Sequence, residues 1–137
     1  MEPYAIVSLI LALQFAAFGW RVNREISVGD EGRKTWFPIA DWVNVVAMIA
    51  TAIWGIIVPL ATQRFGRASI VVVGIAALLI AVHPVSMACH YRIPSKDGRA
   101  IYPKNGRDYP YATGREIVCL ILTAVAVIYF AWYLAAR

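Results

Sequence analysis

Charged residues, cysteines and histidines are scarce in this chain. Of its 137 residues, 15% are charged, two are cysteine and two are histidine. A soluble domain carries about a quarter charged residues, so this composition argues against a water-soluble globule. Two cysteines are too few for a disulfide framework. The few polar residues supply no serine–histidine–acid set, no pair of catalytic carboxylates and no phosphate-binding loop, which favours a protein that is not an enzyme.

Apolar residues make up 61% of the chain, and its mean hydropathy is +0.64. They fall into four blocks, at residues 4–20, 38–61, 69–88 and 117–136. Each block is long enough to cross roughly 30 Å of hydrocarbon at about 1.5 Å per residue. We therefore predict an all-α fold consisting of one integral membrane domain, a four-helix bundle of four transmembrane helices.

Two local patterns support this bundle. Ala47, Thr51 and Gly55 recur at intervals of four, which gives the second block a face of small residues. A second helix can approach closely on such a face. Thr113 lies three residues before Glu116, the spacing of a capping box, and predicts the start of the fourth helix.

Basic residues gather in the two long loops, 21–37 and 89–116. Ten of the thirteen Lys and Arg residues lie there, and the other three lie in the short second loop and at the C-terminus. The positive-inside rule places the two long loops in the cytoplasm and both termini outside. The expected location is a prokaryotic inner membrane.

The cations of the long loops form the first candidate site. Arginine forks bind carboxylate and phosphate groups, so an anionic ligand, a lipid headgroup or an acidic partner surface would suit them. A plainer interpretation is that they fix topology and hold membrane lipids loosely. Nucleic acid is not expected, because no nucleic-acid-binding fold can be drawn here. The candidates are Arg21, Arg24, Arg33, Lys34, Arg92, Lys96, Arg99, Lys104, Arg107 and Arg115.

Imidazole and thiol side chains form a second candidate site. His83, Cys89, His90 and Cys119, with Asp41 in addition, are expected near the cytoplasmic ends of the helices. Such ligands suit zinc or copper, and a single histidine suits a tetrapyrrole such as haem. The alternative is that the cysteines fill space in the core and the histidines bond neighbouring helices.

A third set consists of polar side chains within the predicted spans: Gln14, Asn44 and Thr51, with His83 and Thr123. Pumps and coupled transporters keep a carboxylate or a base deep in the membrane, and the sequence places none at the midplane. Hydrogen bonding between helices is therefore the favoured role of this set. The alternative is a homo-oligomeric channel or carrier lined by Gln14, Asn44, Thr51 and Thr123.

The first half of the chain resembles the MAPEG family, the membrane-associated glutathione transferase and eicosanoid proteins. The resemblance is carried by Arg21–Arg24 (RVNR), Val28–Gly32 (VGDEG) and Asn44. It implies a four-span trimer with a cytoplasmic active site that uses glutathione. The sequence departs from the family at Ala40 and Ala47, which stand about where the family has an arginine and a glutamate.

Three functions therefore remain in view. The leading one is a non-enzymatic small subunit of a membrane complex, docked through its basic cytoplasmic loops. The others are a MAPEG-like glutathione-dependent transferase and a homo-oligomeric channel or carrier. The small-residue faces favour assembly into a homo-oligomer or a larger membrane complex.

Overall fold

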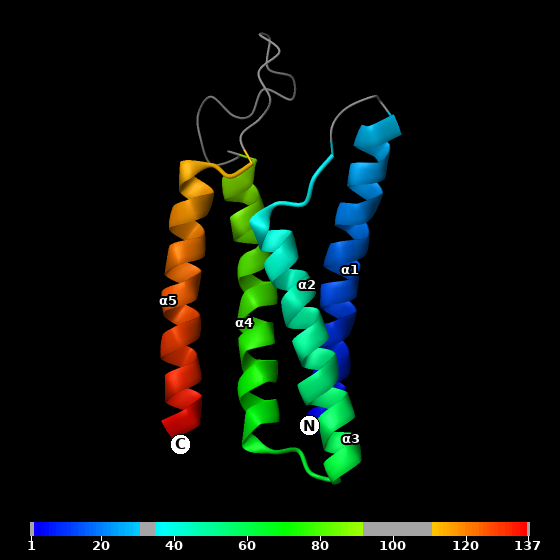
Figure 1. Cartoon of the computed structure of the whole chain (residues 1–137), viewed down its shortest axis with the longest axis vertical. Coiled ribbons are helices and arrows are strands. Elements are labelled where there is room, and N and C mark those ends of the chain that lie inside the picture. Colours follow the sequence, from blue (N-terminus) through cyan, green and yellow to red (C-terminus); the bar gives the residue numbers. More distant parts are fainter. Residues whose placement is uncertain (1, 31–34, 92–110, 137) are drawn as a thin grey trace.

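The structure is a computed structural model that describes residues 2–30, 35–91 and 111–136, and the regular elements within these ranges are helical. They form four spans (Figure 1): α1 (Pro3–Asp30), then α2 (Ile39–Ala52) continued by η1 (Ile53–Ile57) and α3 (Val58–Thr62), then α4 (Arg67–His90) and α5 (Gly114–Ala136). Each span is long and apolar enough to cross a membrane. The prediction of an all-α, integral membrane four-helix bundle is confirmed.

Both long loops start and finish at one end of the bundle. There α1 and α4 end and α2 and α5 begin, whereas the two chain termini and the connection from α3 to α4 lie at the opposite end (Figure 1). We term the first the basic end, because the segments that leave and enter it carry most of the Lys and Arg residues. The arrangement is that of four spans crossing in alternating directions.

The helices reach further at the basic end than the apolar blocks predict. The first helix was expected to end at residue 20 but continues to Asp30, and α4 continues to His90. At about 1.5 Å per residue, α1 is about 42 Å long, well beyond the roughly 30 Å of hydrocarbon. Apolar blocks measure only the part of a helix that lies in lipid, so they missed these polar extensions.

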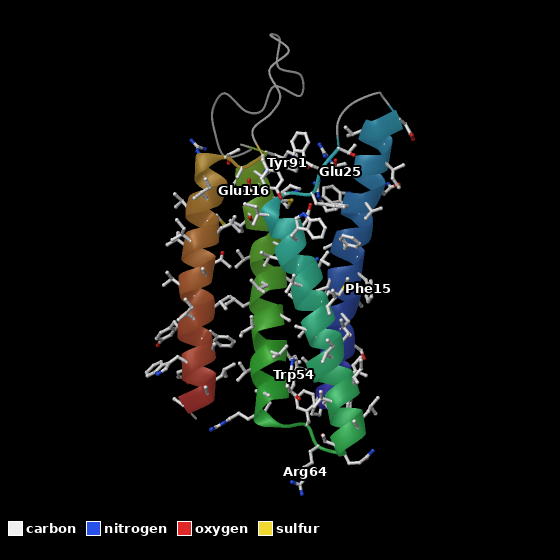
Figure 2. All side chains as sticks on the ribbon, viewed as in Figure 1. Phe15, Glu25, Trp54, Arg64, Tyr91 and Glu116 are labelled. Atoms are coloured by element: carbon white, nitrogen blue, oxygen red, sulfur yellow. The ribbon has the colours of Figure 1, made fainter. Side chains whose placement is uncertain are left out.

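The spans differ in how deeply they are packed. Helices α1, α2 and α4 pack against one another, while α5 packs mainly against α4 and is the least buried span. The apolar core lies toward the end with the chain termini and consists of Val7, Ile10, Leu11, Val73 and Ala76. Large apolar side chains such as Phe15 and Trp54 point outward (Figure 2), which suits a surface that faces lipid rather than water.

The second span is not a uniform α-helix. Its central η1 segment is π-helical, and the N–H of Val58 donates to the carbonyl of Ile53, five residues back. The cause is Pro59, which lies two residues after the end of η1. Proline has no N–H, and in a regular α-helix its ring would clash with the carbonyl four residues before it. The wider π-turn relieves that clash, and it brings Gly55 against Val7 and Val73.

Candidate functional site

A buried ion network lies at the basic end and ties three spans together. Arg21 on α1 donates from Nε to Oδ2 of Asp41 on α2 over 2.7 Å, and Oδ1 of Asp41 lies 2.9 Å from Nε2 of His83 on α4. The three side chains are 1%, 2% and 8% exposed. Charges removed from water in this way are tolerated only with close partners, so Asp41 holds α1 and α4 to α2.

The network continues outward to the mouth of the bundle. Arg21 donates from Nη1 to the hydroxyl of Tyr91 and from Nη2 to Oε1 of Glu25 over 3.0 Å. Arg24 reaches the same Glu25 oxygen at 2.8 Å, and its guanidinium lies 4.7 Å from the centre of the Tyr91 ring. The backbone N–H of Trp36 donates to Oε2 of Glu25 over 3.3 Å. Each of the three nitrogens of the Arg21 guanidinium group thus bonds a group of the same chain.

A small cavity of about 40 Å³ lies beside this outer part of the network. Figure 2 shows that Glu25 and Tyr91 both lie near the basic end. The cavity is lined by Arg21, Arg24, Glu25, Val28, Trp36, His90 and Tyr91. Sites for small organic ligands run from about 300 to 1,000 Å³, so among the described residues this cavity has room for a water molecule or two and not for a peptide-sized cofactor.

A second polar cluster fastens α5 to α4. Nδ1 of His90 lies 2.6 Å from Oε2 of Glu116, which also accepts the backbone N–H of Thr113. The Thr113 hydroxyl accepts the N–H of Glu116 at 3.2 Å and donates to the carbonyl of Cys89 at 3.0 Å. Both bonds of the predicted capping box are therefore present, and the Glu116 side chain, which is fully buried, also bonds the neighbouring helix.

The intramembrane polar residues lie inside the chain. Gln14 and Thr51 are fully buried and Asn44 is 3% exposed. Asn44 donates from Nδ2 to the backbone carbonyl of Gln14 at 3.4 Å, which bridges α1 and α2, and the Thr51 hydroxyl bonds the carbonyl of Ala47 at 2.7 Å. These side chains therefore face helices of their own chain.

Several buried polar atoms in this region have no hydrogen-bond partner among the described residues. They are both amide atoms of Gln14, Oδ1 of Asn44, Oγ of Ser86 and Oε1 of Glu116. Each unpaired buried polar group costs about 1–3 kcal/mol. The interior next to the ion network is therefore polar and incompletely paired.

The four proposed metal ligands do not come together as one set, although Cys89 and Cys119 neighbour each other. His83 is bonded to Asp41 and His90 to Glu116, while Cys89 and Cys119 line a shallow apolar groove between α4 and α5. Across residues 2–30, 35–91 and 111–136, no three His, Cys, Asp or Glu side chains are placed to hold a metal ion. The two histidines lie on one continuous helix, α4, but each bonds a carboxylate of a different helix.

The candidate cations divide into three groups. Arg21 and Arg24, predicted in a loop, are on α1, and Arg21 is buried in the network, so the loop placement was wrong for both. Arg115 is exposed at the start of α5. The remaining candidates lie outside the described residues: Arg33, Lys34, Arg92, Lys96, Arg99, Lys104 and Arg107.

Three partners in these clusters were not predicted as site residues: Glu25, Tyr91 and Glu116. Glu25 carried a usable signal, because it lies four residues after Arg21 on a continuous helix. The capping-box spacing pointed to Glu116 only as a helix cap. The contacts of Tyr91 with Arg21 and of Glu116 with His90 carried no signal, since they join residues 70 and 26 positions apart.

Taken together, the helices and the clusters define a class: a small polytopic membrane protein with a paired ionic cluster at one end of its bundle. No family model matches the chain, and no curated protein and no solved structure is similar to it.

Proposed function

We propose that this protein is a non-enzymatic subunit of a membrane complex and that its basic end docks an acidic surface of a partner. The observation that carries the proposal is the internal pairing of the ion network: Asp41 and Glu25 both bond Arg21 within the chain. A catalytic or transport site keeps groups available for a substrate. Here the buried charges are used to fix the ends of α1, α2 and α4 as a rigid platform.

The charge that remains for a partner is positive. The segment 89–116 holds six Lys and Arg residues, and the acidic residues in it are Asp97, Asp108 and Glu116. Glu116 is already bonded to His90, so a net positive charge is left on the segment. Cations clustered in one segment of the sequence favour an acidic protein surface through steering and complementarity.

The test is purification of the full chain from its native membrane in mild detergent. We expect a partner chain to co-purify and to be lost when Lys96, Arg99, Lys104 and Arg107 are changed together to Gln. The matched control changes Arg64 and Arg67 to Gln, because these cations lie at the opposite end of the bundle (Figure 2 shows Arg64 there). This control should retain the partner, and salt should weaken the wild-type complex.

Three outcomes would overturn the proposal. A closed homo-oligomer without a foreign chain that forms a glutathione thiolate would favour the MAPEG-like transferase. The same homo-oligomer with ion or solute flux in liposomes would favour the channel or carrier. Equal loss of the partner in both charge variants would show that the contact is not made by the basic end.

A further inference from the structure

A small, partly open cavity with a few polar side chains in its lining lies next to the ion network. Its volume is about 20 Å³, and it lies between side chains of α2, α4 and α5. A cavity needs about 10–15 Å³ to hold one water molecule, and the water needs two to four polar partners. The lining residues are Ala40, Val43, Asn44, Leu79, Val82, His83, Ser86, Leu120 and Thr123.

Two of the unpaired buried atoms belong to residues that line this cavity. They are Oδ1 of Asn44 and Oγ of Ser86, on side chains 3% and 2% exposed. The orientation of the Asn44 amide is fixed, because its NH₂ group faces the backbone carbonyl of Gln14, which can only accept. Its oxygen therefore needs a donor from another source. In a helix surrounded by hydrocarbon, bulk water cannot supply that donor.

We propose that this cavity is a binding site for one water molecule. The water donates to Oδ1 of Asn44 and accepts the hydroxyl hydrogen of Ser86. His83 and Thr123 complete the polar lining. The hydroxyl oxygen of Thr123 can accept the second hydrogen of the water, since it already donates its own hydrogen to the carbonyl of Cys119. An apolar molecule of the same size would leave both atoms unpaired.

The bound water extends the ion network into the membrane interior. The chain of contacts runs from Tyr91 at the basic end through Arg21 and Asp41 to His83, whose side chain borders both Asp41 and the cavity. Beyond the polar interior, toward the termini, lies the apolar cluster that includes Val7 and Val73. The proposed water thus lies at the inner end of this chain of bonded side chains.

The direct test is a crystal or electron-microscopy structure of the full chain in lipid, at a resolution that shows buried waters. We expect a water within hydrogen-bond distance of both Asn44 Oδ1 and Ser86 Oγ. An empty cavity in a map that shows other buried waters would overturn the proposal. So would protein partners for both atoms.

Infrared spectroscopy of the protein in lipid gives a second readout. We expect an O–H stretching band of an isolated internal water that shifts in H₂¹⁸O. Ser86→Thr keeps the hydroxyl and adds a methyl group to the cavity, so the band should disappear. Ser69→Thr is the matched control, because Ser69 is a buried serine of the same helix outside the cavity lining, and it should keep the band.

Thr123→Val is a second variant should Ser86→Thr fail to fold, and we expect it to shift the band through loss of one acceptor. A band unchanged in every cavity variant would place the water elsewhere and overturn the site. None of these readouts involves a partner chain, so their result is independent of the proposed docking function.

Discussion

Asp41 is the residue on which the basic end depends. Its two carboxylate oxygens serve different helices, with Arg21 on one and His83 on the other. Its position in the first turn of α2 adds the favourable field of unpaired N–H groups at a helix start. One side chain therefore holds three spans in register, at a depth where solvent does not replace it.

Replacing Asp41 by Asn should destabilise the protein strongly. The Asn side chain keeps one acceptor but removes the charge, which leaves Arg21 with Glu25 as its remaining carboxylate partner. Removing one partner of a buried pair costs about 3–5 kcal/mol. Asp30→Asn is the control, because Asp30 is exposed at the end of α1, and it should change stability by less than about 0.5 kcal/mol. Denaturant unfolding in lipid nanodiscs measures both, and equal stability of the two variants would contradict the role given to Asp41.

The sequence predicted part of this residue pattern. Asp41 and His83 were placed near one another, and Gln14, Asn44 and Thr51 were predicted inside the bundle, because each is a polar residue within an apolar block. The pairing of Arg21 with Asp41 was missed since the first helix was ended at residue 20. Which carboxylate contacts which histidine depends on how each helix is rotated about its axis. The 3.6-residue periodicity predicts which residues share a helix face, but not which neighbouring helix that face contacts.

At the scale of elements, close approach between spans depends on glycine at two positions. A Cβ at Gly55 would lie 2.9 Å from Cγ1 of Val7 and 3.3 Å from Cγ2 of Val73. A Cβ at Gly74 would lie 3.0 Å from the Phe130 ring on α5. The four-residue spacing predicted a close helix contact at Gly55, but it does not show the π-turn before Pro59 that orients this glycine.

Gly55→Ala should destabilise the bundle by overpacking. Val7 is β-branched and fully buried, so it has little freedom to move aside, and extra methyl groups in a packed core cost about 1–3 kcal/mol. Gly19→Ala is a matched control on α1 with nothing within 4 Å of the added Cβ. It should be neutral or stabilising by up to about 1 kcal/mol. Thermal unfolding of the two variants in the same detergent measures this difference in stability. A Gly55→Ala protein as stable as Gly19→Ala would contradict the close packing at Gly55.

The attachment of α5 to α4 depends on a small set of polar contacts. Because α5 is the least buried span, the cap formed by Thr113 and Glu116 and the bond to His90 should carry much of its attachment. Thr113→Ala removes the capping hydroxyl and should cost about 0.5–2 kcal/mol. We expect faster hydrogen exchange in the first turns of α5 and unchanged exchange in α1. Equal exchange in α5 of wild type and variant would show that the cap does not hold it.

At the scale of the whole molecule, the number, order and apolar extents of the spans followed from hydropathy. This was possible because lipid demands that backbone polar groups be satisfied inside each span, which leaves a strong signal in a single sequence. The helix ends outside lipid are under no such constraint, so the extension of α1 to Asp30 and of α4 to His90 left no comparable signal.

The distribution of positive charge predicts the orientation of the chain in the membrane. Ten of thirteen Lys and Arg residues lie in the two segments that meet the basic end, so the positive-inside rule places that end in the cytoplasm. Single cysteines can report it once Cys89 and Cys119 are replaced by Ser. Ser27→Cys lies on the part of α1 beyond the hydrocarbon at the basic end, and Ala68→Cys lies at the opposite end, both exposed.

An impermeant maleimide should label Ala68→Cys in intact cells and Ser27→Cys only after the cells are permeabilised. The reverse pattern would put the basic end outside and remove the cytoplasmic docking surface, while leaving the four-span fold intact. Labelling of both positions from the same side would contradict the fold itself, because an odd number of crossings separates Ser27 from Ala68. The pair of positions therefore tests orientation and topology separately, with each cysteine serving as the control for the other.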